Sequence, residues 1–267
     1  MKNVVLTIAG SDSGGGAGIQ ADLKTFSALG VFGTSAITAI TAQNTVGVDA
    51  VKVLRADIVT QQIKSVATDF SVAAAKTGML ANAEIIAAVA AAVRAHSIEK
   101  LVVDTVMVSK SNHRLLASEA EAAMRGILLP LAFVVTPNLP EAEVLTGMKI
   151  TNLAAMHEAA QKLFALGAKH VLVKGGHLED APATDVFFDG KDFTELVAER
   201  IATTSTHGTG CTLSAAIAAY LALGLSPLEA CRNAKTYLTG ALRHAVKLGH
   251  GHGPVNHFWN HPLSPPL

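Results

Sequence analysis

Short apolar runs alternate along the chain with segments in which apolar residues recur every three or four positions. The runs are unbroken by polar residues and lie at Val4–Ala9, Val72–Ala75, Leu101–Val103, Phe133–Val135 and Val171–Val173. Helical spacing occupies Ile19–Leu29, Asp57–Asp69, Ala83–Ala95, Ser118–Leu128 and Asn152–Leu166. Strands that are apolar on both faces are typical of a parallel sheet covered by helices on each side. The pattern therefore predicts an α/β fold, a three-layer α/β/α sandwich with a mainly parallel central sheet.

Two regions depart from this alternation, and the last third is helical throughout. The departures are two extra strands joined by a polar loop, at Val31–Thr41 and Val51–Leu54, and a hairpin at Thr184–Phe188 and Phe193–Leu196. The C-terminal helices are expected at Thr209–Leu223 and Leu228–Leu248. No repeat or low-complexity linker interrupts the chain, so residues 1–267 are expected to form one domain, with a poorly ordered tail at 256–267.

Composition then narrows the class of protein. Half of the 267 residues are hydrophobic, which excludes a disordered chain. The 21 basic and 21 acidic residues cancel, whereas a nucleic-acid-binding protein usually carries a basic surplus. The longest clean apolar run, Ile85–Val93, is far shorter than the roughly 20 residues of a membrane span. The two cysteines, Cys211 and Cys231, suit a reducing compartment, so we expect a cytoplasmic protein with no nucleic-acid or membrane partner.

The strongest chemical signal is the glycine-rich segment Thr206–Thr212 (THGTGCT), which precedes the apolar helix at 213–223. Glycines allow close approach of the backbone, and a helix start offers unpaired N–H groups at the positive end of the dipole. Together they form an anion hole suited to phosphate, with Cys211 in the first turn, where this field lowers the pKa of a thiol. A glycine-rich turn with a buried cysteine explains the same residues equally well.

Four other segments carry glycines or polar residues at expected strand ends. The glycine cluster Gly10–Gly18 matches neither a P-loop nor a dinucleotide fingerprint and is weak evidence alone. Asn138 and Glu141 could bind a hydrated Mg²⁺, or could equally form a helix-capping pair. Asp104 and Lys174 each end a strand. If these segments converge at the carboxyl ends of the strands, their glycines, carboxylates and lysine together suit phosphoryl transfer.

Eight motifs, in order over almost the whole chain, resemble those of the bacterial hydroxymethylpyrimidine/phosphomethylpyrimidine kinases of thiamine biosynthesis, which are ribokinase-like. They are Ala9–Asp12, Gly15–Asp22, Ala42–Thr45, Lys76–Leu80, Asp104–Met107, Thr136–Glu141, Val173–His177 and His207–Thr212. The resemblance implies two ATP-dependent phosphorylations, first of 4-amino-5-hydroxymethyl-2-methylpyrimidine and then of its monophosphate. It also implies a homodimer.

The resemblance further implies roles for individual residues. Gln43 and Asp22 would bind the aminopyrimidine, in a pocket lined by Gly10 and Met79. ATP phosphates would meet Lys174, Thr206 and the anion hole of Gly208, Thr209 and Gly210. The residues that would organise Mg²⁺ are Asp104, Asn138 and Glu141. Cys211 stands where ribokinase has its catalytic base, so we predict that it is the base. A flexible Ser13-Gly14 replaces the family's usual Pro-Ser.

Some alternatives stay open at this level. A pyridoxal or pyridoxine kinase shares the fold and also phosphorylates a hydroxymethyl group on a flat heterocycle, although Gln43 and Met79 favour the pyrimidine. A non-catalytic pyrimidine-sensing module is the second alternative, and the joint presence of Lys174 and Cys211 argues against it. Gln43 could be an ordinary loop amide. A lid over ATP is expected either in Ser109–Arg114 or in the hairpin around Asp189.

Overall fold

The computed structural model describes residues 3–107, 118–176 and 182–260. Within them, one sheet has the strand order β3-β2-β1-β4-β5-β6-β7-β8-β9. Its strands are β1 (Val4–Asp12), β2 (Phe32–Gln43), β3 (Val48–Val53), β4 (Val72–Thr77), β5 (Leu101–Val103), β6 (Val134–Val135), β7 (Val171–Val173), β8 (Ala183–Phe188) and β9 (Phe193–Ala198). The helices are α1 (Gly18–Ala28), α2 (Ala56–Asp69), α3 (Ala83–Ala95), α4 (Ser118–Ala123), α5 (Leu139–Thr146), α6 (Leu153–Ala165), α7 (Thr209–Ala222) and α8 (Pro227–Arg243).

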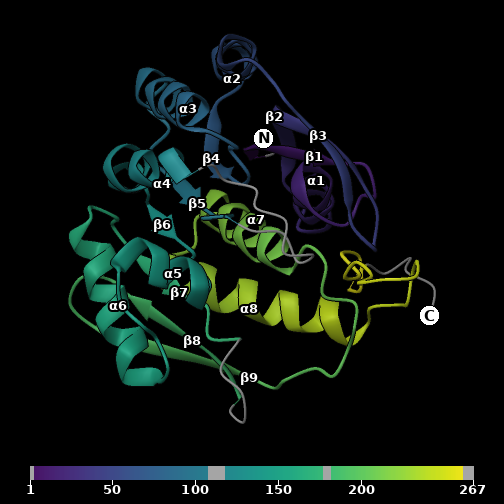
Figure 1. Cartoon of the computed structure of the whole chain (residues 1–267), viewed down its shortest axis with the longest axis vertical. Coiled ribbons are helices and arrows are strands. Elements are labelled where there is room, and N and C mark those ends of the chain that lie inside the picture. Colours follow the sequence, from purple (N-terminus) through teal and green to yellow (C-terminus); the bar gives the residue numbers. More distant parts are fainter. Residues whose placement is uncertain (1–2, 108–117, 177–181, 261–267) are drawn as a thin grey trace.

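The central strands are buried on both faces, as their unbroken apolar runs predict. Successive side chains of a strand point to opposite faces. On β5, Leu101 and Val103 pack in the core beneath α2 to α6, whereas Val102 packs in the core beneath α1, α7 and α8. Figure 1 shows these two sets of helices on opposite sides of the sheet. The three-layer α/β/α fold is thereby confirmed.

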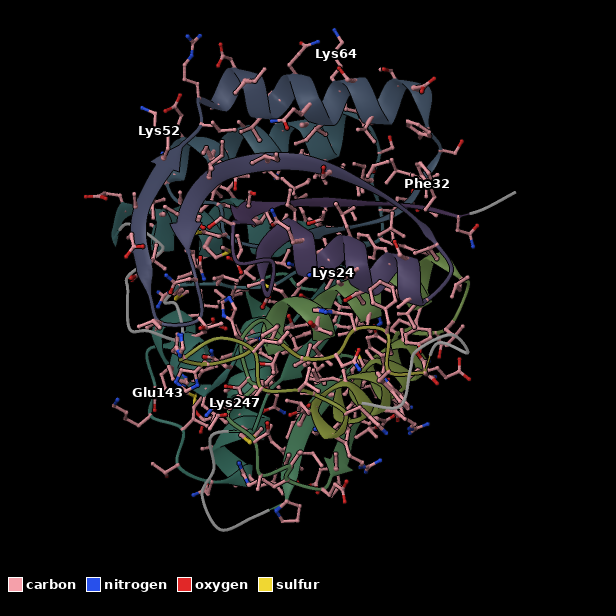
Figure 2. The ribbon with its side chains drawn as sticks, turned by 90° about the vertical axis from the view of Figure 1, so that its right-hand side faces the viewer. Lys24, Phe32, Lys52, Lys64, Glu143 and Lys247 are labelled. Carbon is pink, nitrogen blue, oxygen red and sulfur yellow. The ribbon has the colours of Figure 1, made fainter. Side chains whose placement is uncertain are left out.

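Antiparallel strands extend the parallel core at both edges. The strands from β2 through β1, β4, β5 and β6 to β7 are parallel, whereas β3 pairs antiparallel with β2 and the β8–β9 hairpin continues antiparallel from β7. Figure 2 shows the curved ribbons of β2, which begins at Phe32, and of β3, which carries Lys52. These are the extra strands and the hairpin that the sequence pattern predicts.

The C-terminal region differs from the sequence expectation. Helix α8 ends at Arg243 rather than at Leu248, because the Ala241 carbonyl, which would accept from residue 245 in a continued helix, accepts from the Asn256 N–H at 3.1 Å instead. Residues 256–260 are not a loose tail. The indole N–H of Trp259 donates to the Tyr237 carbonyl at 3.1 Å, and a Cβ on Gly240 would lie 2.2 Å from the Trp259 ring. Residues 261–267 lie outside the described chain.

The carboxyl ends of the parallel strands lie in one row across the sheet. This row of strand ends is the edge at which the polar residues gather, and it is distinct from the outermost strands β3 and β9. The Asp104 N–H donates to the Thr77 carbonyl at 3.0 Å, which places the residue after β5 beside the end of β4. The Lys174 N–H donates to the Pro137 carbonyl at 2.8 Å, which places the residue after β7 beside the loop after β6. Residues that are far apart in sequence therefore meet where ligands bind in open α/β sheets.

Candidate active site

An ion pair between Asp104 and Lys174 lies at the centre of this edge. Lys174 Nζ is 3.2 Å from Asp104 Oδ1, and the Ser214 hydroxyl of α7 is 3.2 Å from Asp104 Oδ2. Burial disfavours the charged lysine, but the carboxylates of Asp104 and Glu141 outweigh this effect and raise the pKa of Lys174. The Lys174 ammonium group thus provides a positive charge at the site, as phosphate binding requires.

The start of helix α7 lies over this pair and has no side-chain cap. Helices α3, α5, α6 and α8 are capped by Asn or Ser side chains, whereas α7, like α1 and α2, has no side-chain acceptor for its first N–H groups, and its N-cap is Gly208. A Cβ on Gly210 would lie 3.5 Å from Lys174 Nζ and 3.7 Å from Asp104 Oδ2. The sequence prediction that this segment and Lys174 converge therefore agrees with the geometry.

Gly208 also joins the two glycine-rich segments. Its φ of 78° lies in the left-handed region, and a Cβ there would approach within 1.8 Å of the Gly16 carbonyl oxygen. The loop between β1 and α1 is thus pressed against the start of α7. Thr206 and Thr209 flank the contact, and the Thr209 N–H is 3.4 Å from the Thr206 carbonyl. No side chain larger than hydrogen fits at position 208.

Cys211 occupies the first turn of α7 as predicted, but its thiol does not have the lowered pKa that the helix field alone implies. Burial raises the pKa of the Cys211 thiol to about 11, although the charge of Lys76 acts in the opposite direction. That expectation was wrong because the sequence pattern shows the helix start but not the packing of neighbouring segments around Cys211, which leaves the residue only partly exposed. Cys231, expected in the core, is fully buried.

Asn138 and Glu141 form the helix cap that was the alternative to a metal role. The Asn138 side chain accepts from the Glu141 N–H at 2.9 Å, and Glu141 Oε2 accepts from the Asn138 N–H at 2.9 Å. The Thr105 hydroxyl donates to the same Glu141 oxygen at 2.9 Å. Burial, aided by Asp104, raises the pKa of Glu141, and Lys174 opposes the rise. The cap holds Glu141 beside the charged pair, so capping and metal binding are compatible for this residue.

The residues predicted to bind the pyrimidine fall into two groups. Gly10 and Met79 are in contact, since a Cβ on Gly10 would lie 2.7 Å from Met79 Cε. Gln43, at the end of β2, lies near His207, with 3.3 Å between their Nε2 atoms. Asp22 differs, because its side chain is fully buried in an ion pair with Lys76. Direct contact between Asp22 and a substrate stays a prediction, and the geometry favours an indirect role.

Lys76 is a residue of this region that sequence reasoning missed. Its Nζ lies 3.0 and 2.9 Å from the two Asp22 oxygens, and the Thr7 hydroxyl donates to Asp22 at 2.5 Å. Burial acts against the ammonium, but Asp22 outweighs it, so the pKa of Lys76 is raised. The available signal was a lysine at the end of an otherwise apolar strand, where a charge without a partner would be costly.

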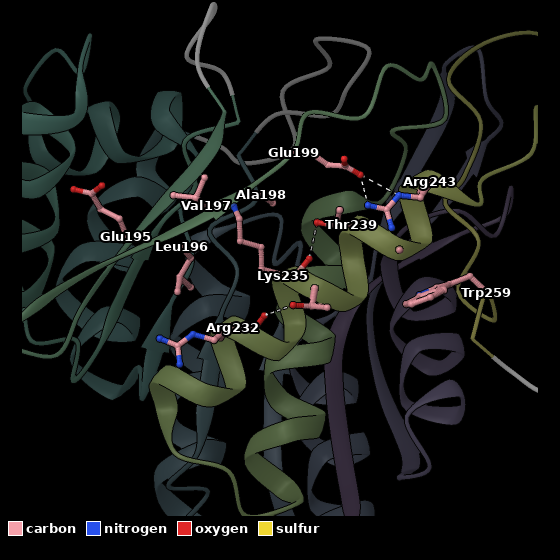
Figure 3. A pocket seen from close by; sticks show the side chains of 12 residues that line it. Glu195, Leu196, Val197, Ala198, Glu199, Arg232, Lys235, Thr239, Arg243 and Trp259 are labelled. Carbon is pink, nitrogen blue, oxygen red and sulfur yellow. Dashed lines mark hydrogen bonds and ion pairs between the residues drawn. The ribbon is translucent and has the colours of Figure 1, made fainter.

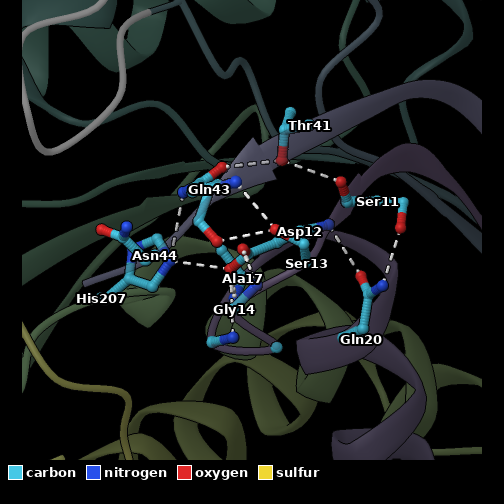
Figure 4. A network of polar contacts seen from close by, with 12 residues as sticks. Ser11, Asp12, Ser13, Gly14, Ala17, Gln20, Thr41, Gln43, Asn44 and His207 are labelled. Atoms are coloured by element: carbon cyan, nitrogen blue, oxygen red, sulfur yellow. Dashed lines mark hydrogen bonds and ion pairs between the residues drawn. The ribbon is translucent and has the colours of Figure 1, made fainter. Parts of the chain in front are cut away.

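A second missed cluster surrounds Asp12 at the end of β1 (Figure 4). The Asp12 carboxylate accepts from the N–H groups of Gly14, Gly16 and Ala17 at 2.8, 3.1 and 2.8 Å. His207 Nε2 is 2.8 Å from Asp12 Oδ2. Burial opposes ionisation, but these hydrogen bonds outweigh it and lower the pKa of Asp12. His207 stands in the motif before Gly208, which was the only signal for its role.

Of the two segments considered as lids, Ser109–Arg114 lies outside the described residues. A groove of about 460 Å³ runs between β9 and α8, with Glu199, Arg232 and Arg243 among its lining side chains (Figure 3). None of the predicted site residues lines this groove.

In the described part of the chain, every helix is too short or too polar to span a membrane.

Comparison with known sequences agrees with these motifs. Residues 12–256 match the family model described as phosphomethylpyrimidine kinase. A hydroxymethylpyrimidine/phosphomethylpyrimidine kinase of Rhizobium meliloti is 54% identical over 97% of this chain and 98% of its own length. A thiamine biosynthesis bifunctional protein ThiED of Geobacter sulfurreducens is 51% identical over 96% of this chain, which spans only 52% of that protein.

Solved structures of two activities share the fold. A pyridoxal kinase from Staphylococcus aureus, in complex with AMP-PCP and pyridoxal, is 39% identical with a TM-score of 0.90, covering 98% of this chain and 96% of that one. A phosphomethylpyrimidine kinase from Clostridium difficile is 47% identical with a TM-score of 0.81, covering 90% of this chain and all of that one. Of these two structures, the phosphomethylpyrimidine kinase has the higher sequence identity to this chain, whereas the pyridoxal kinase has the higher TM-score.

Proposed function

Because the chain belongs to the phosphomethylpyrimidine kinase family, we propose that it phosphorylates 4-amino-5-hydroxymethyl-2-methylpyrimidine and then its monophosphate, with ATP as donor. The observation that carries this proposal is the Asp104–Lys174 pair beneath the uncapped start of α7. Phosphoryl transfer depends mainly on positioning and charge neutralisation, and this arrangement supplies both. The two free cysteines suit a cytoplasmic enzyme.

In this proposal the chain's own residues hold the phosphates at the edge of the sheet. Gly208, Thr209 and Gly210 offer backbone N–H groups at the positive end of α7, and Thr206 lies just before them. Lys174 adds a fixed positive charge to the γ-phosphoryl group as it transfers. Gly10 and Met79 form the wall for a flat ring, while Gln43 offers amide donors and acceptors. Cys211 would receive the proton of the attacking hydroxyl group.

The residues present suit a magnesium ion. Within the described residues, no three His, Cys, Asp or Glu side chains gather to hold a metal by themselves. Mg²⁺ commonly takes only one or two carboxylates, together with waters and substrate phosphates, so Asp104 and Glu141 would suffice, with Asn138 beside them. When bound, the ion would neutralise charge on the phosphates. The side-chain oxygen of Asn138 already accepts from the Glu141 N–H, so its part would be indirect.

We expect Glu141→Gln to raise the Mg²⁺ concentration for half-maximal rate by about tenfold, the lower range for residues that tune a metal site. Glutamine retains the capping geometry but removes the charge. Initial rates against Mg²⁺ concentration measure the effect. Glu229→Gln is the matched control, because Glu229 holds the same capping position on α8. Equal Mg²⁺ requirements in the two variants would reduce Glu141 to a capping residue.

The test of the proposed function is a reaction of purified protein with Mg-ATP and the hydroxymethylpyrimidine, in which product masses are followed over time. Monophosphate followed by diphosphate is the expected result. Pyridoxal and pyridoxine are run in parallel, because the backbone similarity to a pyridoxal kinase makes that activity the second candidate. Turnover of the pyridine substrates alone would replace the proposal. Binding of the pyrimidine without turnover would favour a sensing module.

We also propose that the chain forms a homodimer through the β2–β3 edge. Edge strand β3 exposes Val51, and Ile40 of β2 and Val46 of the connecting loop are more than half exposed. Apolar side chains exposed along a sheet edge favour association.

Light scattering is expected to give twice the 27.6 kDa chain mass for the wild-type protein, and the Val51→Lys variant is expected to be a monomer. Val197→Lys, on the opposite sheet edge β9, should remain dimeric. A monomeric wild-type protein would refute the proposed homodimer.

A further inference from the structure

His207 lies between a buried carboxylate and the amide of Gln43. Its Nε2 is 2.8 Å from Asp12 Oδ2 and 3.3 Å from the amide nitrogen of Gln43 (Figure 4). The three residues come from the end of β1, the end of β2 and the loop before α7, so the contact exists only in the folded protein. The His207 side chain is 13% exposed.

Hydrogen-bond counting places a hydrogen on the Nε2 atom of His207. The Asp12 carboxylate accepts three backbone N–H bonds, which favour its ionised form. An ionised carboxylate is only an acceptor, so the His207 Nε2 atom must carry the hydrogen that it shares with Asp12. The same atom cannot then accept a hydrogen bond from the Gln43 NH₂ group.

The orientation of the Gln43 amide follows from this restriction. With its nitrogen toward His207, two donors would face each other. Rotating the amide by 180° brings its oxygen to 3.3 Å from His207 Nε2, where it is the weaker acceptor of a three-centre hydrogen bond whose N–H is shared with Asp12. The amide nitrogen then donates to Thr41 Oγ1, 3.1 Å away on the other side. The Thr41 hydroxyl hydrogen then goes to the Ser11 carbonyl at 3.0 Å. In this arrangement no two donors face each other among His207, Gln43 and Thr41.

The backbone of Gln43 is held separately. Its N–H donates to the Ser13 hydroxyl at 2.8 Å, and its carbonyl accepts from the same hydroxyl at 2.7 Å. The position of residue 43 therefore does not depend on His207, whereas the direction of its amide does. After the bonds to His207 and Thr41, one N–H and one oxygen lone pair of the amide remain unused.

We propose that His207, held by Asp12, is a positioning residue that fixes the Gln43 amide so that it presents one donor beside one acceptor to the substrate ring. This pair complements a ring nitrogen next to an exocyclic amine, as in an aminopyrimidine. A ring that carries a hydroxyl group in place of the amine gains less from the fixed orientation. His207 thus sets ring selectivity, and the inference rests on the proposed function of Gln43.

The test measures binding of the hydroxymethylpyrimidine by calorimetry without ATP. His207→Leu removes the N–H and is expected to raise the pyrimidine Kd about tenfold, the lower range for a lost hydrogen bond to a charged or polar network. His207→Gln retains an N–H donor and should recover most of the affinity. The Kd for AMP-PCP, measured in the same variants, should change less than threefold. His250→Phe, at an exposed site, is the matched control.

A double-mutant cycle separates positioning of Gln43 from general support of the loop. In a Gln43→Ala background, His207→Leu should raise the Kd by less than twofold, because no amide remains to be oriented. A full tenfold effect in that background, or wild-type affinity in His207→Leu, would overturn the inference. If the wild-type protein neither binds nor phosphorylates the pyrimidine, the proposed function itself fails, which is a separate result.

Discussion

The Cys211→Ala variant is expected to lower kcat by about 10²-fold or more, the range for loss of a general base, while the pyrimidine KM changes little. Cys211 stands in the first turn of α7, beside the segment that would bind the transferring phosphoryl group. Cys231→Ala, which removes the other thiol from the core, is the matched control and should retain turnover. Undiminished turnover in Cys211→Ala would remove the thiol from the mechanism.

The pH dependence of the wild-type enzyme gives an independent test of the same role. A thiol acts as a base only as thiolate, and burial raises its pKa to about 11 in the ligand-free protein. Below that pKa the thiolate fraction rises tenfold with each pH unit. We therefore expect kcat/KM to increase from pH 7 to pH 10 in the wild-type enzyme, and the increase to be absent in Cys211→Ala. Similar profiles in both proteins would assign Cys211 a purely positioning role.

The Lys76→Met variant is expected to lose about 3–5 kcal/mol of unfolding free energy, the range for breaking a buried ion pair. Lys76 and Asp22 are both fully buried, and removal of the lysine leaves the carboxylate without its partner. Chemical denaturation measures the loss. Lys149→Met is the matched control, because Lys149 pairs with Glu143 at a similar 3.0 Å on the surface and should change the free energy by less than about 1 kcal/mol.

The sign of the pH dependence in Lys76→Met follows from Asp22. Burial raises the pKa of Asp22, and without Lys76 nothing of comparable strength opposes the rise. A carboxyl group with a folded-state pKa above its unfolded value binds more protons when folded, so unfolding free energy falls as pH rises. We expect the deficit of the variant to shrink between pH 8 and pH 5. An Asp22→Asn second change should recover much of the stability at neutral pH. A deficit that is independent of pH would point to packing rather than charge.

The sequence alone determined the layered fold and the edge at which the polar residues gather. Unbroken runs such as Leu101–Val103 carry that information locally, because a strand apolar on both faces needs helices on both sides. Parallel strands then bring their carboxyl ends to one edge, so the convergence of Asp104 and Lys174 could be predicted without coordinates. The helix start at Gly208 was equally readable from its glycines.

The tertiary structure alone decided the partners and the protonation states. Asp22 meets Lys76 across 54 positions of sequence, and Asp12 meets His207 across 195, so no local pattern reveals either contact. The pKa of the Cys211 thiol depends on how completely neighbouring segments exclude water, which outweighs the helix field that the sequence does show. Strand and helix periodicity are properties of adjacent residues, whereas desolvation and charge pairing are properties of the packed whole.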